Sequence, residues 1–214
     1  MSKSGGEVRA TAHGSTDGAY TLSEILSQPL CWTTSLKALR TTGRLREVAE
    51  KFRDAEEWLF LGCGSSYYVA QAAAATMAKL TGLPARALPA SEPLLFPDVA
   101  LAGEKKYAPV LISRSGRTSE ALKAAEVLKK RGVKTVGISC APGQTLEKLV
   151  DEAIILPAAD EQSTVMTRSF STMLLALQAL AATIAGRDEF IKALEHLTPA
   201  AEKRITALVK QAVS

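Results

Sequence analysis

The sequence predicts an α/β fold, a three-layer αβα sandwich around a five-stranded parallel sheet, with extra helices at both ends of the chain. Short apolar runs bounded by turn residues alternate with longer segments of helical periodicity. Runs that are mostly apolar, rather than alternating with polar residues, are typical of parallel strands buried on both faces. The expected strands are residues 58–61, 86–88, 110–112, 135–139 and 153–156.

The segments between these strands predict the helices. Pro29 and Gly43 break the first helical stretch, and Gly82 and Gly132 follow two others as C-terminal caps. The expected helical segments are 22–52, 67–80, 91–96, 119–130, 164–184, 188–196 and 199–212.

At 214 residues, a single domain is expected. We expect a flexible segment rich in Gly and Ser over residues 1–20 and a helical segment over 21–56. The α/β domain is expected over 57–186, and C-terminal helices over 187–214.

The ligand site is predicted from the strand order. Right-handed crossovers leave few topologies, and five strands favour the flavodoxin-like order 2-1-3-4-5. Ligands of such sheets bind beyond the carboxyl ends of the strands, between the first and third strands, where the order reverses. The two loops richest in Ser and Gly follow those strands: Gly62-Cys63-Gly64-Ser65-Ser66 and Ser113-Arg114-Ser115-Gly116-Arg117-Thr118.

Both loops carry groups that suit a phosphate monoester. Glycines let the backbone approach a ligand, and the following helix presents unpaired N–H groups with partial positive charge. The hydroxyls of Ser66, Ser113, Ser115 and Thr118 add neutral donors that can hold a dianion without lysine. The alternative is that these hydroxyls only cap two ordinary helices. Their presence after both strands of the ligand edge favours the phosphate site.

Other ligand classes fit less well. Gly62-Cys63-Gly64 begins like a dinucleotide fingerprint, but Tyr67 occupies the place of its third glycine, and no Walker Gly-Lys-Ser/Thr occurs. The net charge of +4 is spread along the chain and only 5% of residues are aromatic, which argues against a nucleic-acid partner. No apolar run reaches the roughly 18 residues of a membrane-spanning helix, so no membrane partner is expected.

The cysteines indicate a reducing compartment. Cys31, Cys63 and Cys140 are odd in number and far apart, which argues against a disulfide framework and favours the cytoplasm. Cys63 fits a small buried residue better than a nucleophile, since no histidine lies near it in the sequence. The sequence shows no metal-ligand cluster, so we expect no metal.

Four segments, in chain order, resemble the sugar isomerase (SIS) domain family. Residues 61–68 (LGCGSSYY) are similar to its G-C-G-T-S-Y-Y loop, residues 90–92 (ASE) to its A-S-E-F segment, and residues 112–118 (ISRSGRT) to its I-S-Q-S-G-E-T loop. Residues 161–170 (EQSTVMTRSF) resemble the segment that enters the long helix. With residues 24–29, they are most similar to galactosamine/tagatose-6-phosphate deaminase-isomerases and to the isomerase half of glucosamine-6-phosphate synthase.

The resemblance implies roles for residues of these segments. Ser66, Ser113, Ser115 and Thr118 would bind the phosphate of a sugar phosphate, the expected small-molecule ligand. Arg114 and Arg117 depart from the family's Gln and Glu, and either strengthen phosphate binding or point to solvent. Further contacts would come from the loop residues Gly64, Ser65, Arg114 and Gly116, and from Thr164 and Met166 beside the sugar carbons.

The resemblance also implies a phosphosugar isomerase or amino-sugar-phosphate deaminase-isomerase acting through an open-chain sugar and an enediol. Such chemistry needs neither a metal nor an organic cofactor, so no cofactor is expected. Moving a proton between C1 and C2 needs a base near neutral pH. Glu92 and Glu161 are the candidates, whereas Glu120, His13 and His196 are expected to be solvated. In the synthase the isomerisation residues belong to a second SIS domain and tail, so we expect the base in a missing second domain or a partner. The alternative is a non-catalytic sensor of sugar phosphates.

An assembly is expected as well. The helix predicted over 164–184 is apolar nearly all round, so part of it should be buried beyond one sheet layer. We therefore expect a homodimer or pairing with a second SIS domain, unless the C-terminal helices cover that face themselves.

Overall fold

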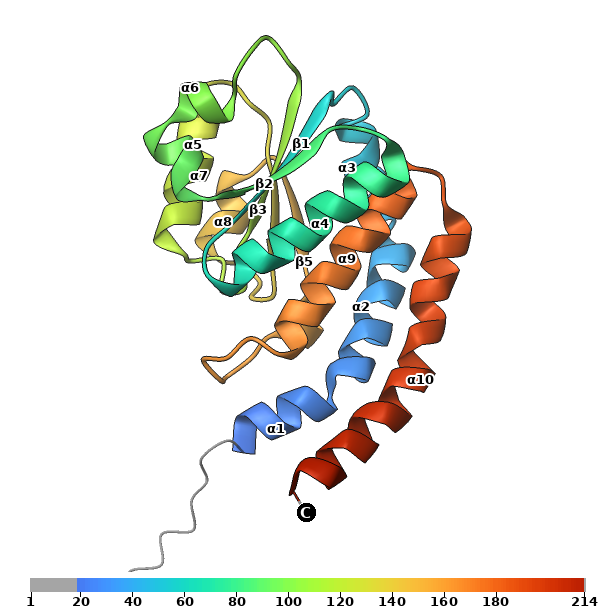
Figure 1. The fold of residues 1–214 in the computed structure, drawn as a ribbon. Coiled ribbons are helices and arrows are strands. Elements are labelled where there is room, and N and C mark those ends of the chain that lie inside the picture. Colours follow the sequence, from blue (N-terminus) through green and yellow to red (C-terminus); the bar gives the residue numbers. More distant parts are fainter. Residues whose placement is uncertain (1–18, 214) are drawn as a thin grey trace, which may run out of the picture.

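The computed structural model describes residues 19–213, which form a parallel sheet with helices on both faces (Figure 1). The strands run in the order β2-β1-β3-β4-β5. They are β1 (Glu57–Gly62), β2 (Ala85–Pro89), β3 (Tyr107–Ile112), β4 (Val136–Ser139) and β5 (Glu152–Ile155). The α/β fold and the predicted strand order are confirmed.

The helices follow the strands in alternation, as the periodicity predicts. The N-terminal segment forms α1 (Ala19–Leu26), α2 (Gln28–Thr42) and α3 (Arg44–Lys51). The remaining helices are α4 (Ser65–Thr81), α5 (Ser91–Leu95), α6 (Pro97–Ala100), α7 (Ser119–Lys130), α8 (Thr145–Leu149), the 3₁₀ turn η1 (Pro157–Ala159), α9 (Arg168–Ile184) and α10 (Asp188–Val213).

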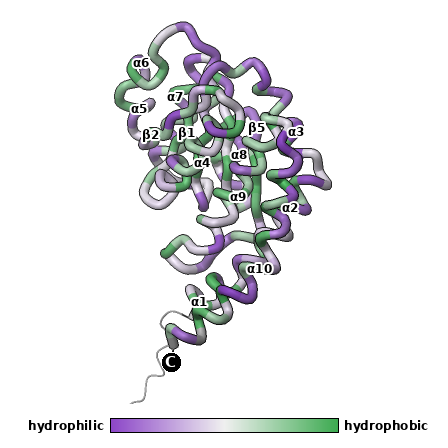
Figure 2. Tube along the Cα trace, turned by 45° about the vertical axis from the view of Figure 1, so that its right-hand side comes forward, coloured by the Kyte–Doolittle hydropathy of each residue, from purple (hydrophilic) through white to green (hydrophobic). Residues whose placement is uncertain are grey.

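The central strands β1, β3 and β4 are buried on both faces because each face of the sheet carries its own apolar core, whereas the edge strands β2 and β5 are mostly half-buried. Trp58 and Phe60 of β1 face the larger core, which the apolar sides of α4 and α9 complete. Leu59 and Leu61 face the smaller core, which includes Leu128 of α7 and residues of α8. Figure 2 shows the hydrophobic stretches inside the sheet domain, with further ones on α1 and α10 away from the sheet.

Some predicted boundaries at the N-terminus change. Of the segment expected to be flexible, residues 1–18 lie outside the described residues, and α1 already begins at Ala19. Gly43 ends α2 in a left-handed conformation, as expected, with φ of 69°. The other break falls at Ser27 rather than at Pro29, because proline is well accommodated in the first turn of α2.

Two predictions for the C-terminal half are wrong. The segment 164–167 is a loop, and the helix expected from residue 164 begins at Arg168. The two helices expected at the end form one helix, α10, with Pro199 inside it. Proline deprives only the Glu195 carbonyl of its helical partner, and α10 also packs against α2 and α9.

The apolar helix α9 is covered by helices of its own chain. It contacts α2, α3 and α4 as well as α10, and Met173, Leu177 and Leu180 are almost fully buried. Helices of the chain itself therefore cover this face, but α2, α3 and α4 contribute alongside the C-terminal helix α10, and α9 gives no support for a partner. Among residues 19–213, no helix combines the length and apolar character needed to cross a membrane.

Candidate functional site

The two Ser- and Gly-rich loops start side by side at the carboxyl edge of the sheet. β1 pairs with β3 in parallel, with Gly62 opposite Ile112, so Cys63 and Ser113 leave the sheet at the same level. β2 lies on the other side of β1 and brings α5 to this edge. This is the reversal point of the strand order, where the sequence places the ligand.

The first loop brings backbone and hydroxyl groups close together. A Cβ on Gly62 would lie 2.4 Å from the carbonyl oxygen of Ser66, so only glycine fits there. Gly64 has φ of 54° and turns the chain into α4, whose first residue is Ser65. Ser66 is buried while Ser65 is exposed. The N-terminus of α4 is thereby directed at the carboxyl edge, with its partial positive charge.

The loop after β3 holds a pair of hydroxyls. Ser113 is buried, and its Oγ lies 2.8 Å from Oγ1 of Thr118. The Ser115 Oγ accepts a hydrogen bond from the Arg117 amide at 3.2 Å. Gly116 is left-handed, with φ of 63°, and a Cβ there would lie 2.8 Å from Cβ of Gln144.

The helix-cap alternative fails for this site. Neither α4 nor α7 receives a side-chain hydrogen bond at its N-cap, which is Gly64 in α4 and Thr118 in α7. The Thr118 hydroxyl pairs with Ser113 instead. The hydroxyls therefore lie at two helix N-termini without serving as their caps.

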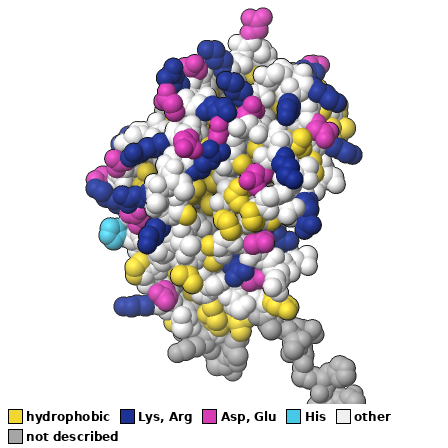
Figure 3. Space-filling view, turned by 180° about the vertical axis from the view of Figure 1, so that it is seen from behind, with side chains coloured by type: hydrophobic (Ala, Val, Ile, Leu, Met, Phe, Trp, Pro, Cys, Tyr) yellow, Lys and Arg dark blue, Asp and Glu magenta, His cyan; other side chains and the backbone are white. Residues whose placement is uncertain are grey.

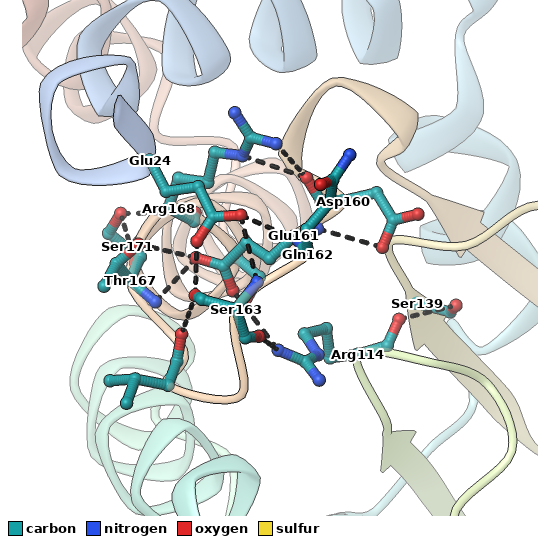
Figure 4. A network of polar contacts seen from close by, with 12 residues as sticks. Glu24, Arg114, Ser139, Asp160, Glu161, Gln162, Ser163, Thr167, Arg168 and Ser171 are labelled. Carbon is teal, nitrogen blue, oxygen red and sulfur yellow. Dashed lines mark hydrogen bonds and ion pairs between the residues drawn. The ribbon is translucent and has the colours of Figure 1, made fainter. Parts of the chain in front are cut away.

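The two arginines of this loop differ in their surroundings. Arg117 is exposed and makes no ion pair within residues 19–213. Arg114 reaches the loop after β5, where its Nη1 donates to the Ser163 carbonyl at 2.8 Å and lies 3.8 Å from Oε2 of Glu161 (Figure 4). Arg114 therefore neither points to solvent nor faces only the phosphate loop: its partners, Ser163 and Glu161, belong to the loop after β5.

Glu161 fixes the loop that precedes α9. Its Oε1 accepts hydrogen bonds from the amide and the hydroxyl of Thr167, at 2.7 and 2.6 Å, and its Oε2 accepts one from the Ser169 hydroxyl. The side chain has no exposed surface. A carboxylate so engaged is not open to a ligand, which differs from the expectation that Glu161 serves as a base.

A second buried carboxylate holds the same loop from α1. Glu24 accepts hydrogen bonds from the amides of Gln162 and Ser163, at 2.7 and 3.2 Å, and from the Ser163 hydroxyl. Burial alone would raise its pKa, but these hydrogen bonds and the charge of Arg168 outweigh burial and hold the pKa below its ordinary value. Sequence reasoning missed Glu24, although a charged residue among the apolar positions of a helix is a signal for it.

The remaining predicted residues lie around these loops. Glu92 is in the first turn of α5, half-buried, and its carboxylate has no hydrogen bond or ion pair with any described residue. Thr164 is exposed in the loop before α9, whereas Met166 packs partly against the larger core. Glu120 is exposed on α7, as expected. His196 is exposed on α10, as expected, and His13 lies outside the described residues.

The thiol of Cys63 has surroundings that disfavour a nucleophile. Burial, and then the negative charge of Glu120, raise its pKa above the ordinary value, although the Ala90 amide partly opposes them. All three cysteines are free. Among residues 19–213, no three His, Cys, Asp or Glu side chains gather as they would around a metal ion.

Two cavities lie away from this edge. One, of about 490 Å³, lies between α2 and α10 and includes Leu36, Arg40 and Thr198. The other, of about 360 Å³, is at the amino ends of the strands and includes Lys51, Lys105, Lys106 and Lys134. The second is rich in lysine, so it is the alternative place for an anion.

The fold and the loops define an α/β domain with two Ser- and Gly-rich loops at the carboxyl edge between the first and third strands, and comparison with known proteins gives the family. The SIS domain model matches residues 51–183, so the chain belongs to the SIS domain family.

The particular relatives are longer proteins. The chain is 29% identical over 206 residues to a glutamine–fructose-6-phosphate aminotransferase (isomerizing) of Shewanella oneidensis, a match that covers 91% of this chain and 32% of that protein. It spans about a third or less of the curated relatives it matches.

Solved structures share the fold. The tagatose-6-phosphate ketose/aldose isomerase of Escherichia coli superimposes with a TM-score of 0.75 at 22% identity, over 89% of this chain and 54% of that one. The protein c3406 of E. coli CFT073, solved in complex with a sugar phosphate, gives a TM-score of 0.65 at 21% identity, over 86% of this chain and 97% of that one. That solved chain is thus matched over almost its whole length.

Proposed function

We propose that this chain binds a phosphorylated sugar, with the phosphate held by the loops after β1 and β3. The observation that carries the proposal is the pair of N-terminal helix ends at one sheet edge, together with the buried hydroxyls of Ser66 and Ser113 and the half-buried hydroxyl of Thr118. Neutral donors and helix N-termini suit a dianionic phosphate. The E. coli relative in complex with a sugar phosphate supports the same class of ligand.

The proposed activity is phosphosugar isomerisation or amino-sugar-phosphate deamination–isomerisation. The names of the aminotransferase (isomerizing) relative and of the tagatose-6-phosphate isomerase support it. Of the two carboxylates expected to act as a base, Glu92 has no partner among the described side chains, while Glu161 is engaged by Thr167 and Ser169. Glu92 is therefore the better candidate within the chain, and a second domain or partner is the other source of a base.

A non-catalytic sugar-phosphate sensor is the second candidate function. It is favoured by the engagement of Glu161, which leaves few carboxylates near the loops. The two functions share the phosphate site and differ only in turnover. Release of ammonia from galactosamine 6-phosphate, or isomerisation of fructose 6-phosphate, separates them.

Pairing with a second copy or a second SIS domain is part of the proposal. With α9 covered, the support comes from exposed apolar side chains on the terminal helices. Tyr20, Leu30, Leu197 and Leu208 are each more than half exposed. Hydrophobic side chains gather on the lower part of the molecule in Figure 3. Others, Tyr68 of α4 and Val165 before α9, are exposed near the ligand edge, so a partner could border the site.

The test is a thermal-melting panel. Hexosamine 6-phosphates and fructose 6-phosphate should stabilise the chain by about 2.7 kcal/mol when their concentration is about 100 times the dissociation constant. The same sugars without phosphate should leave the transition unchanged. Stabilisation by NAD or ATP, with none by any sugar phosphate, would overturn the proposal.

A further inference from the structure

Arg114 joins three loops at the carboxyl edge of the sheet. Its carbonyl accepts hydrogen bonds from the Cys140 amide at 2.9 Å and from the Ser139 hydroxyl at 3.2 Å, which ties the loop after β3 to the end of β4. Its guanidinium donates to the carbonyl of Ser163, in the loop after β5. One residue of the phosphate-site loop thus also fixes a segment that begins about fifty residues later.

That segment, residues 161–167, is held on its other side as well. Glu24 of α1 accepts from two of its amides, and Glu161 closes it onto Thr167 (Figure 4). Between these attachments, Thr164 and Val165 are exposed. The segment therefore has fixed ends and an exposed centre, and Arg114 is its direct link to the phosphate-site loop.

We propose that Arg114 is a positioning residue that sets residues 161–167 against the phosphate-site loop, so that both loops hold the sugar phosphate together. The inference rests on the proposed function, because it assigns the phosphate to one loop and contacts with the sugar to the other. If the loop is already ordered in its binding conformation, the ligand does not have to order it, and binding is stronger because that entropic cost is avoided. Arg114 would act through the loop rather than by contact with the phosphate.

Positioning and direct contact give different results. Inorganic phosphate can occupy only the phosphate-site loop, whereas a sugar phosphate uses both loops. Arg114→Gln removes the hydrogen bond to Ser163. It should lower the affinity for glucosamine 6-phosphate by about tenfold, the loss expected for one charge-assisted hydrogen bond. It should leave the affinity for inorganic phosphate unchanged within about twofold. Glu24→Gln loosens the same segment from the opposite side and should give the same selective loss.

Arg117→Gln is the matched control, because Arg117 lies in the same loop, carries the same charge and is exposed. Because Arg117 makes no hydrogen bond or ion pair with residues 161–167, its replacement should not produce the selective loss: any change in affinity should be the same for glucosamine 6-phosphate and for inorganic phosphate. If Arg114→Gln lowered the affinity for both ligands equally, Arg114 would contact the phosphate directly, and the positioning role would be overturned. Equal effects of the Arg114 and Arg117 variants would overturn it too.

Hydrogen exchange without ligand tests the link independently of the proposed function. In Arg114→Gln, amides of residues 161–167 should exchange at least several-fold faster than in the native chain, while Arg117→Gln should match the native chain. Unchanged exchange in Arg114→Gln would refute the link even if sugar phosphates bind. If the exchange responds but no sugar phosphate binds the native chain, the link stands as a structural feature, and both the proposed function and the ligand role assigned to Arg114 are refuted. Arg114→Lys, which keeps the charge, should restore part of the protection.

Discussion

Replacement of Ser113 by alanine tests the phosphate site most sharply, because this hydroxyl is buried yet serves no helix as a cap. In the ligand-free chain its Oγ shares one neutral hydrogen bond with Thr118, at 2.8 Å. Losing such a bond lowers the free energy of unfolding by about 0.5–1.5 kcal/mol. Ser113 is only 1% exposed, but alanine is smaller than serine, so the substitution causes no overpacking at this buried position.

The effect on binding should be larger than the effect on stability. A hydrogen bond to a charged group contributes about 1.5–3 kcal/mol, which corresponds to a loss of roughly 10- to 150-fold in affinity for a sugar phosphate. Calorimetric titration with glucosamine 6-phosphate measures the affinity, and thermal unfolding measures the stability. Ser119→Ala, at an exposed serine one residue beyond Thr118, is the control and should change neither. A loss of stability in Ser113→Ala without a loss of affinity would refute the assignment.

Three further predictions concern Glu24, Gly116 and Cys63, which are buried or half-buried. Because the folded pKa of Glu24 lies below its ordinary value of 4.5, its stabilisation is present above about pH 4.5 and is lost as the pH falls through the folded pKa. The difference in unfolding free energy between the native chain and Glu24→Gln, about 1.5–3 kcal/mol at pH 7, should therefore shrink below pH 4.5; a constant difference would contradict this. In Gly116→Ala the new Cβ would lie 2.8 Å from Cβ of Gln144, whereas in Gly43→Ala it meets no atom within 4 Å, and both positions are left-handed. Gly116→Ala should therefore lower the free energy of unfolding, measured by chemical denaturation, by about 1–3 kcal/mol more than Gly43→Ala does. Since burial raises the pKa of Cys63, iodoacetamide should modify it more slowly than a free thiol at pH 7.5, and Cys63→Ala should bind sugar phosphates like the native chain; faster modification would show an activated thiol.

Much of the fold follows from local sequence signals. The apolar run at 58–61 falls within β1, and α7 begins and ends at the predicted residues. Gly82 ends α4 in the left-handed conformation that its place after an alanine-rich helix predicts. These features depend on residues close together in the chain, so periodicity and turn chemistry are sufficient.

The features that the sequence did not predict depend on distant contacts. Val165 and Met166 suit the apolar helix that follows them, yet α9 starts only at Arg168. The loop before it is held at Ser163 by Arg114 and Glu24, which lie far away in the sequence. Glu161 then binds the Thr167 amide at the start of the helix. α10 continues through Pro199 while it packs along α2. The attachment of Glu24 to residues more than a hundred positions later is likewise invisible to a local pattern.

The same distinction applies to the site. The two hydroxyl-bearing loops can be located from the sequence because strand order alone brings their starting points together. The partner of Arg114 cannot, because the direction of a long side chain depends on the loop after β5, whose path the sequence leaves open.

The most direct test of the central claim is where a sugar phosphate perturbs the chain. Backbone amide spectra of the labelled protein should be recorded during titration with glucosamine 6-phosphate, with glucosamine as the control. We expect saturable shifts concentrated at residues 62–66 and 113–118 for the phosphorylated sugar and none for glucosamine. Shifts confined to the lysine-rich cavity at the amino ends of the strands, around Lys105, Lys106 and Lys134, would show that the anion binds there and would contradict the assignment.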